Sequence, residues 1–105
     1  AEVEFVQSNS EGDLVTVVGR SADRFEGILI NPAGYTHTSV ALLDAIKACG
    51  LPCIEVHMTN IHGREDFRRR SITAAGCRGQ ICGLGAASYV LGLEGLVGLI
   101  SETRG

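Results

Sequence analysis

The chain is 105 residues long, enough for one domain with a single hydrophobic core, so residues 1–105 are treated as one unit. Hydrophobic residues make up 45%, charged residues 20% and aromatic residues 5%, the profile of an ordinary globular domain. The net charge of −3 argues against a protein that binds nucleic acid or an anionic membrane, because both partners require a basic surface. No apolar run reaches the length of a membrane span and the first residues do not resemble a signal peptide, so we expect a cytoplasmic protein.

The N-terminal part of the chain predicts a strand, a helix and a second strand. In residues 3–9 (VEFVQSN), apolar and polar side chains first alternate and an apolar pair then follows, a pattern that predicts a strand. Ser10 is a candidate N-cap with Asp13 three residues later, and the apolar residues that follow predict a short amphipathic helix. Residues 27–31 (GILIN) form an apolar run too short for a helix, which indicates a buried strand.

The second half continues this alternation. The segment TSVALLDAIKACG has helical spacing, with Thr38 or Ser39 as its predicted cap and Gly50 as its end. Residues 53–58 (CIEVHM) and 79–85 (GQICGLG) predict two more strands. Residues 88–100 predict a final helix, although three glycines lower its intrinsic propensity.

The order β-α-β-α-β-loop-β-α predicts an α/β fold with right-handed crossovers and a parallel sheet covered on both faces. Ligands bind such sheets at the carboxyl ends of the strands. Polar segments follow two of the predicted strands, NPAGYTHT after GILI and HMTNIHGRE after CIEV. Because both segments emerge at one edge of the sheet, we predict one crevice shared by six polar residues: Asn31, His37, His57, Thr59, Asn60 and His62.

The four cysteines do not have the spacing of a zinc ribbon, because no C-x2-C pair is present. No secretory context supports disulfides. Cys53 and Cys82 lie within apolar runs, where a thiol behaves as a small hydrophobic side chain. We expect free, mostly buried thiols at all four positions: Cys49, Cys53, Cys77 and Cys82.

His57 is the strongest candidate for chemistry in the predicted crevice. It stands at the end of a strand, and Glu55, two residues earlier, points to the same face. A carboxylate in that position orients the imidazole and holds it protonated, as a general acid requires. The alternative is a histidine whose hydrogen bonds are simply satisfied; the polar loop beside His57 favours the catalytic interpretation.

The other polar residues suit an oxygen-rich ligand. Asn31 and His37 lie in a loop that leads into a helix, where N–H groups and hydroxyls can bind oxygens or simply cap the helix. Residues 58–60 (MTN) offer backbone amides and a hydroxyl just beyond a strand, a cradle for a carboxylate. Four arginines follow, which form a solvated charged segment unless one of them faces an anionic or polyhydroxylated substrate: Arg64, Arg68, Arg69 and Arg70.

The pattern gives little support to cofactor chemistry. A metal site built from the three histidines and Glu55 lacks the local spacing of zinc enzymes. Lys47, the only lysine, lies in the middle of a predicted helix and is poorly placed to form a Schiff base. The GLG at residues 83–85 has no further glycine at the spacing of a dinucleotide-binding loop. We therefore expect neither a metal nor another cofactor.

Three sequence blocks are similar to a known enzyme family. INPAGYTHTSVALLDA is followed by PCIEVHMTNIHGREDFRRRS and then by GQICGLGAASYVLGLEGL, and together they resemble the type II 3-dehydroquinate dehydratases. The most specific parts are N-P-x-x-Y-T-H-T-S and E-V-H-x-[ST]-N-x-H-x-R-E-x-F-R. The similarity extends from FVQSNSEGDL onward and so covers nearly the whole chain.

The resemblance implies a flavodoxin-like fold and a homo-oligomer, a dodecamer built from trimers. It implies a lyase of the shikimate pathway that removes water from 3-dehydroquinate to give 3-dehydroshikimate, in a biosynthetic or a catabolic role. The reaction passes through an enolate, without Schiff base or metal, which agrees with the solitary Lys47 and with the histidine spacing.

The resemblance also implies two catalytic residues, with His57 as the general acid that protonates the leaving hydroxyl and Glu55 as its support. Met58 and Thr59 would hold the substrate carboxylate through backbone amides and the Thr hydroxyl. Asp44 would reach a neighbouring subunit's site across the trimer interface. The remaining substrate-binding residues would contact the ring hydroxyls: Asn31, His37 and Arg68.

The chain departs from the family pattern at several positions. Thr59 stands where the family usually has Ser, which keeps the hydroxyl. Leu43 replaces a common Arg, and SITAAGCRG at residues 71–79 replaces a segment that usually contains Ser-Pro. The last two departures affect the expected subunit contacts.

The largest departure concerns the N-terminal side. Family members begin with a strand ending in G-P-N-x-N and a mobile loop carrying an Arg and the catalytic Tyr, and these 105 residues contain neither. We therefore expect a sheet without its central first strand, from a chain that is part of a longer polypeptide. Tyr35 and Tyr89 match other family positions and are not expected to be the base. The alternative function is a non-catalytic fragment that binds the pocket ligand without the tyrosine base.

Overall fold

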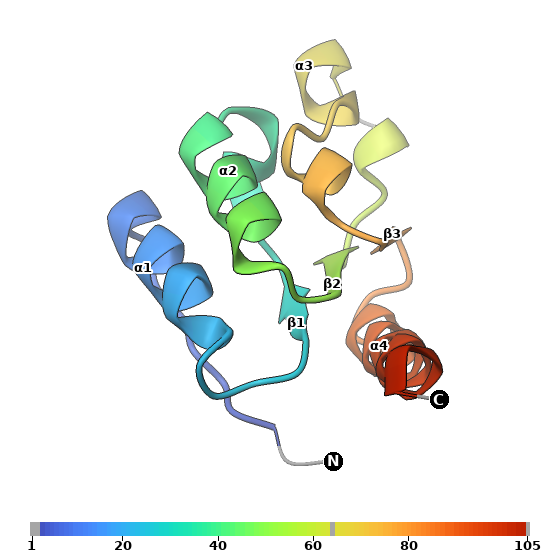
Figure 1. Ribbon diagram of the computed structural model, residues 1–105. Helices are drawn as coiled ribbons and strands as arrows, with labels where there is room; N and C mark the ends of the chain where they lie inside the picture. Colours follow the sequence, from blue (N-terminus) through green and yellow to red (C-terminus); the bar gives the residue numbers. More distant parts are fainter. Residues whose placement is uncertain (1–2, 64, 105) are drawn as a thin grey trace.

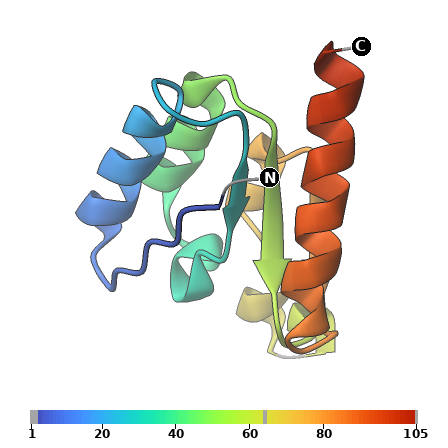
Figure 2. The same cartoon turned by 90° about the horizontal axis from the view of Figure 1, so that it is seen from below.

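A three-stranded parallel sheet lies at the centre of the computed structural model, which describes residues 3–63 and 65–104. Its strands are in the order β1 (Ile28–Ile30), β2 (Cys53–His57) and β3 (Gly79–Cys82). Figures 1 and 2 show two helices on one face of this sheet and a long helix on the other. The predicted α/β class, with a parallel sheet between helices, is confirmed.

The helices on the first face are α1 (Glu11–Ser21) and α2 (Val40–Cys49), and the helix on the second face is α4 (Ala87–Arg104). A 3-10 helix, η1 (Ala33–His37), connects β1 with α2. Three short helical segments connect β2 with β3: η2 (Ile61–Gly63), α3 (Asp66–Arg69) and η3 (Thr73–Gly76).

The central strand β2 is buried along its whole length, as expected for a parallel strand covered on both faces. Its side chains alternate between the two faces. Cys53 packs in the core formed with α1 and α2, while Ile54 and Val56 pack against Leu96 of α4. Glu55 and His57 therefore share the face of Cys53, where the apolar core gives way to polar residues.

The termini of the first two helices follow from their capping residues. The Ser10 side chain accepts from the Asp13 backbone N–H, as predicted. For α2 the cap is Ser39, one of the two candidates: Ser39 accepts from the Leu42 N–H at 2.9 Å, while Thr38 ends η1. The sequence alone does not show which of these two adjacent hydroxyl residues is the cap. The 3-10 turn of η1 decides which of them has the extended backbone that a cap requires. Gly50 ends α2 with the left-handed φ of 72°.

Glycine allows α4 to approach the sheet closely. A Cβ on Gly92 would lie 2.8 Å from Leu29 Cδ1 and 2.9 Å from Val56 Cγ2. The absence of a side chain at this position thus brings the helix against β1 and β2, which offsets the low helix propensity of glycine.

The strand predicted for residues 3–9 is not formed. Among the described residues, no backbone hydrogen bond joins this segment to β1, where the sheet ends. An extended segment becomes a strand only by pairing with another strand, so its polarity pattern alone is not sufficient. The side chain of Phe5 in this segment is 90% exposed.

The four cysteines are free thiols, as predicted, but only Cys53 is fully buried. The Cys77 Sγ lies 3.6 Å from the Cys53 Sγ, and this contact and burial raise the pKa of the Cys53 thiol. Cys53 is therefore a neutral core side chain. None of the helices in the described part of the chain combines the length and apolar character needed to cross a membrane.

Candidate active site

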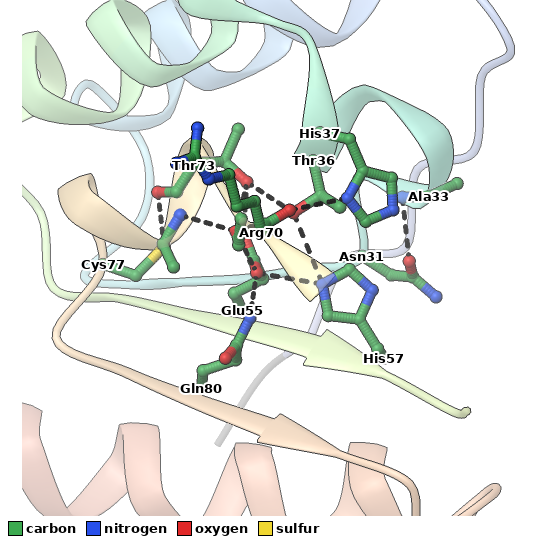
Figure 3. Close-up of polar contacts among 12 residues, drawn as sticks. Asn31, Ala33, Thr36, His37, Glu55, His57, Arg70, Thr73, Cys77 and Gln80 are labelled. Atoms are coloured by element: carbon green, nitrogen blue, oxygen red, sulfur yellow. Dashed lines mark hydrogen bonds and ion pairs between the residues drawn. The ribbon is translucent and has the colours of Figure 1, made fainter. Parts of the chain in front are cut away.

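Glu55 and His57 meet at the carboxyl end of β2. Two positions apart on one strand, their side chains point to the same face, and His57 Nε2 lies 2.9 Å from Glu55 Oε2. Glu55 is fully buried and His57 is 5% exposed. The predicted pairing of the carboxylate with the imidazole is present in the structure (Figure 3).

Four donors from different elements surround the Glu55 carboxylate. Oε2 accepts from His57, from the Ser71 hydroxyl at 2.7 Å and from Gln80 Nε2 at 2.5 Å. Oε1 accepts from the Thr73 hydroxyl. Gln80 faces Glu55 because the two residues are paired in the register of β2 and β3. This number of donors matches the acceptor capacity of an ionised carboxylate.

The pKa of Glu55 reflects the balance between burial and these hydrogen bonds. Burial raises the pKa, but the hydrogen bonds from His57, Thr73, Ser71 and Gln80 together outweigh it and lower the pKa to about 2. Glu55 is therefore ionised at neutral pH and accepts from every neighbour. It follows that His57 Nε2 carries a hydrogen, since a carboxylate has none to donate.

This arrangement leaves Nδ1 of His57 as the nitrogen available to a ligand. Nδ1 has no hydrogen-bond partner among the described residues. Figure 3 shows this nitrogen pointing away from Glu55. A neutral ring presents Nδ1 as an acceptor, and a protonated ring presents Nδ1–H as a donor.

Thr36 of η1 completes the buried polar cluster. Its hydroxyl oxygen lies 2.8 Å from the Ser71 hydroxyl and 2.9 Å from the Thr73 hydroxyl. Because Ser71 and Thr73 donate their hydrogens to Glu55, Thr36 donates its single hydroxyl hydrogen to one of these two oxygens. The Thr36 carbonyl also accepts from the Ile72 N–H at 2.7 Å, which holds η1 against the segment leading into η3.

The comparisons with known proteins agree on one family. The family described as dehydroquinase class II matches residues 1–97. A 3-dehydroquinate dehydratase from Geotalea daltonii is 54% identical over 101 residues, covering 96% of this chain and 70% of the relative. One from Synechocystis sp. is 56% identical over 97 residues, covering 92% of this chain and 64% of the relative. This chain belongs to the class II dehydroquinase family.

Solved structures of class II dehydroquinases share the fold of the chain. The crystal structure of the type II dehydroquinase from Butyrivibrio crossotus matches with a TM-score of 0.89 and 40% identity, over 90% of this chain and 67% of that one. The corresponding structure from Propionibacterium acnes gives 0.81 and 41%, over 86% of this chain and 66% of that one. The predicted flavodoxin-like fold is thereby confirmed. The chain spans about two thirds of the length of its relatives.

Asn31 and His37 of this class II dehydroquinase both follow β1, at the same edge of the sheet as His57. Asn31 donates from Nδ2 to the Tyr89 hydroxyl at 2.8 Å and accepts at Oδ1 from the Ala33 N–H. His37 Nδ1 donates to the Arg70 carbonyl at 2.6 Å. Asn31 lines a hollow of about 280 Å³ and His37 a second of about 480 Å³. The structure thus brings the two residues to the predicted edge but distributes them between two hollows.

The other predicted binding residues are less closely tied to the buried polar cluster around Glu55. The Met58 carbonyl accepts from the Gly85 N–H, and the side chains of Met58 and Thr59 are exposed just beyond β2. Asp44 is exposed in the middle of α2. The side chain of Arg68 and all of Arg64 lie outside the part of the chain that the structure describes.

The histidines do not converge on a common point that would suit a metal. His57 is bonded to Glu55, His37 to the Arg70 carbonyl, and His62 is exposed in η2. Within residues 3–63 and 65–104, no group of three or more His, Cys, Asp or Glu side chains is arranged to hold an ion.

Sequence analysis missed four residues of the dehydroquinase site. Gln80 could have been found by pairing CIEVH with GQIC in parallel register, which sets it opposite Glu55. Ser71 and Thr73 lie in the segment noted only as a departure from the family pattern. The Tyr89 hydroxyl contacts Asn31 although 58 residues separate them in the chain, and no local pattern indicates that contact.

Proposed function

We propose that the protein is a 3-dehydroquinate dehydratase in which His57 is the general acid. The observation that carries this proposal is the buried His57–Glu55 pair at the carboxyl end of β2, in a chain whose relatives are named for this reaction. The relatives support the substrate and the overall reaction. The geometry of the pair supports the roles of His57 and Glu55.

In the proposed reaction, a base removes a C–H proton next to the substrate carbonyl and an enolate forms. The electron pair of the enolate then forms the carbon–carbon double bond as the C–O bond of the leaving hydroxyl breaks. His57 gives its Nδ1 proton to that oxygen, which leaves as water. Glu55 holds Nε2–H throughout, so the ring keeps its orientation in both protonation states.

Six residues are proposed to bind the substrate, two of them through the carboxylate. Met58 and Thr59 would hold that carboxylate through backbone N–H groups and the Thr hydroxyl, consistent with their exposed position beyond β2. Asp44 would act in the site of a neighbouring subunit, which fits its exposure on α2. The others would contact the ring hydroxyls: Asn31, His37 and Arg68.

A homo-oligomer follows from this role of Asp44, and we include a trimer-based dodecamer in the proposal. A cytoplasmic location and a place in the shikimate pathway belong to the same proposal. The free Cys53 and Cys77 thiols, only 3.6 Å apart, are consistent with a reducing compartment.

The first prediction tests whether His57 is the general acid. The purified full-length protein given 3-dehydroquinate, without added metal or reductant, should form the conjugated enone product, whose ultraviolet absorbance rises as it accumulates. His57→Asn should lower kcat by about 10²- to 10⁴-fold, the range for a general acid. Its thermal unfolding should remain cooperative.

Two outcomes would contradict the proposal. Near-normal turnover by folded His57→Asn would show that His57 is not the general acid. Calorimetric binding of the substrate by wild-type protein, with no turnover, would instead support the non-catalytic alternative.

A further inference from the structure

Thr73 is a buried polar residue for which the proposed reaction has no direct use. Its side chain is fully buried, and its hydroxyl donates to Oε1 of Glu55. It also lies 2.9 Å from the Thr36 hydroxyl and 3.4 Å from the Ser71 hydroxyl. Thr73 lies at the start of η3, outside the strand that carries the catalytic pair.

The contact with Oε1 is different from the other contacts of Glu55. The hydrogen bonds from His57, Ser71 and Gln80 all reach Oε2, and among the described residues only Thr73 reaches Oε1. Donors on one oxygen leave a carboxylate free to pivot about that oxygen. A donor on the second oxygen prevents this, and so keeps Oε2 directed at His57 Nε2.

A hydroxyl at this position is costly unless it is bonded, because burying a polar group without a partner is unfavourable. Valine has nearly the same shape and would fill the same space, but it would leave the buried Oε1 of Glu55 without its described donor. The hydroxyl is therefore well placed for orienting Glu55, and packing alone does not require it.

We propose that Thr73 is a positioning residue for the dehydration. It acts through Glu55 to hold the His57 ring in the orientation in which Nδ1 meets the leaving hydroxyl. This role rests on the proposed function and deepens it. Small displacements of a reacting group lower rates steeply, so loss of the hydroxyl should affect kcat more than substrate binding.

The test compares Thr73→Val, which removes the hydroxyl, with Thr73→Ser, which keeps it. Thr73→Val should lower kcat on the order of ten- to hundred-fold with KM changed less than about threefold, and Thr73→Ser should restore most of the loss. Ser21→Ala is the matched control. It removes another buried hydroxyl, bonded to the Val17 carbonyl in α1, and should leave kcat unchanged.

A readout independent of turnover accompanies the kinetics. The ¹⁵N signals of the His57 ring report its tautomer, and Thr73→Val should shift or broaden them while Thr73→Ser and Ser21→Ala should not. Thr73→Ala, which also removes the hydroxyl, replaces the Val variant if that variant does not fold.

Unchanged kcat and unchanged His57 signals in folded Thr73→Val would overturn the proposal and leave Thr73 a purely structural residue. Equal losses in Thr73→Val and Thr73→Ser would also overturn it. If the full-length wild-type protein shows no turnover, the proposed function fails. The His57 signals would then still decide whether Thr73 orients the ring.

Discussion

At the scale of single residues, the ionised Glu55 carboxylate determines which nitrogen of His57 carries the hydrogen. A histidine in water exchanges between two neutral tautomers, but here Nε2 faces an oxygen that can only accept. In the proposed reaction the proton would therefore be given from Nδ1, on the side of the ring that faces away from Glu55. Removing the charge of Glu55 should remove this preference.

The second prediction concerns this tautomer. In wild-type protein, long-range ¹H–¹⁵N correlation spectra should show the neutral His57 ring with its hydrogen on Nε2. Glu55→Gln can present an amide N–H to the ring, so a mixture of tautomers is expected. The exposed Glu94→Gln on α4 is the matched control and should match wild type. A wild-type ring with hydrogen on Nδ1 would contradict the geometry.

The Glu55–His57 pair could be predicted because it depends only on the two-residue period of a strand. Gln80 could be placed opposite Glu55 only by assuming the parallel register of β2 and β3. Ser71 and Thr73 could not be predicted, because they lie 16 and 18 residues further along the chain, outside any strand. Their positions depend on where the segment after α3 returns to the sheet and on the register of β3. Resemblance to a family identified the reaction, but it gave no role to Thr73 or Gln80.

At the scale of elements, the sequence predicts a helix or strand correctly where the segment itself contains a regular apolar pattern or a capping residue. The apolar runs around β1 and β2 and the cap at Ser10 are examples. Residues 3–9 have a strand pattern but form no strand, because pairing depends on a partner elsewhere. Local sequence therefore predicts a tendency to extend, and the neighbouring backbone decides whether a strand forms.

The third prediction compares two glycines of α4. A methyl group on Gly98 would meet no described atom within 4 Å, so Gly98→Ala should raise the free energy of unfolding by about 1 kcal/mol through helix propensity. Gly92→Ala gains the same propensity but places its methyl within 2.9 Å of Leu29 and Val56. Overpacking of this kind costs about 1–3 kcal/mol, so no net gain or a loss is expected.

Urea denaturation at neutral pH, with wild-type protein measured in parallel, gives both values for these glycine variants. Equal stabilisation by the two substitutions would show that α4 does not approach the sheet as closely as the structure indicates.

At the scale of the whole molecule, the buried carboxylate links folding to pH. The pKa of Glu55 is about 2 in the folded protein and 4.5 when unperturbed. A group whose pKa is lowered by folding stabilises the fold above its unperturbed pKa, and this contribution is lost as the pH falls through the folded value. The stabilisation by Glu55 is therefore lost as the pH falls from about 4.5 to about 2. The difference between the two pKa values corresponds to about 3 kcal/mol of folding free energy.

The fourth prediction follows from this linkage. The free energy of unfolding, measured by urea denaturation at a series of pH values, should fall between pH 4.5 and pH 2 more steeply in wild type than in Glu55→Gln. Glu55→Gln should also be less stable at neutral pH, because the hydrogen bonds from Ser71, Thr73 and Gln80 then meet a neutral amide in place of an anion. Glu94→Gln should keep the wild-type slope, since it leaves this cluster intact. Parallel curves for wild type and Glu55→Gln would show that Glu55 is not held ionised in the fold, and the tautomer assigned to His57 would lose its basis.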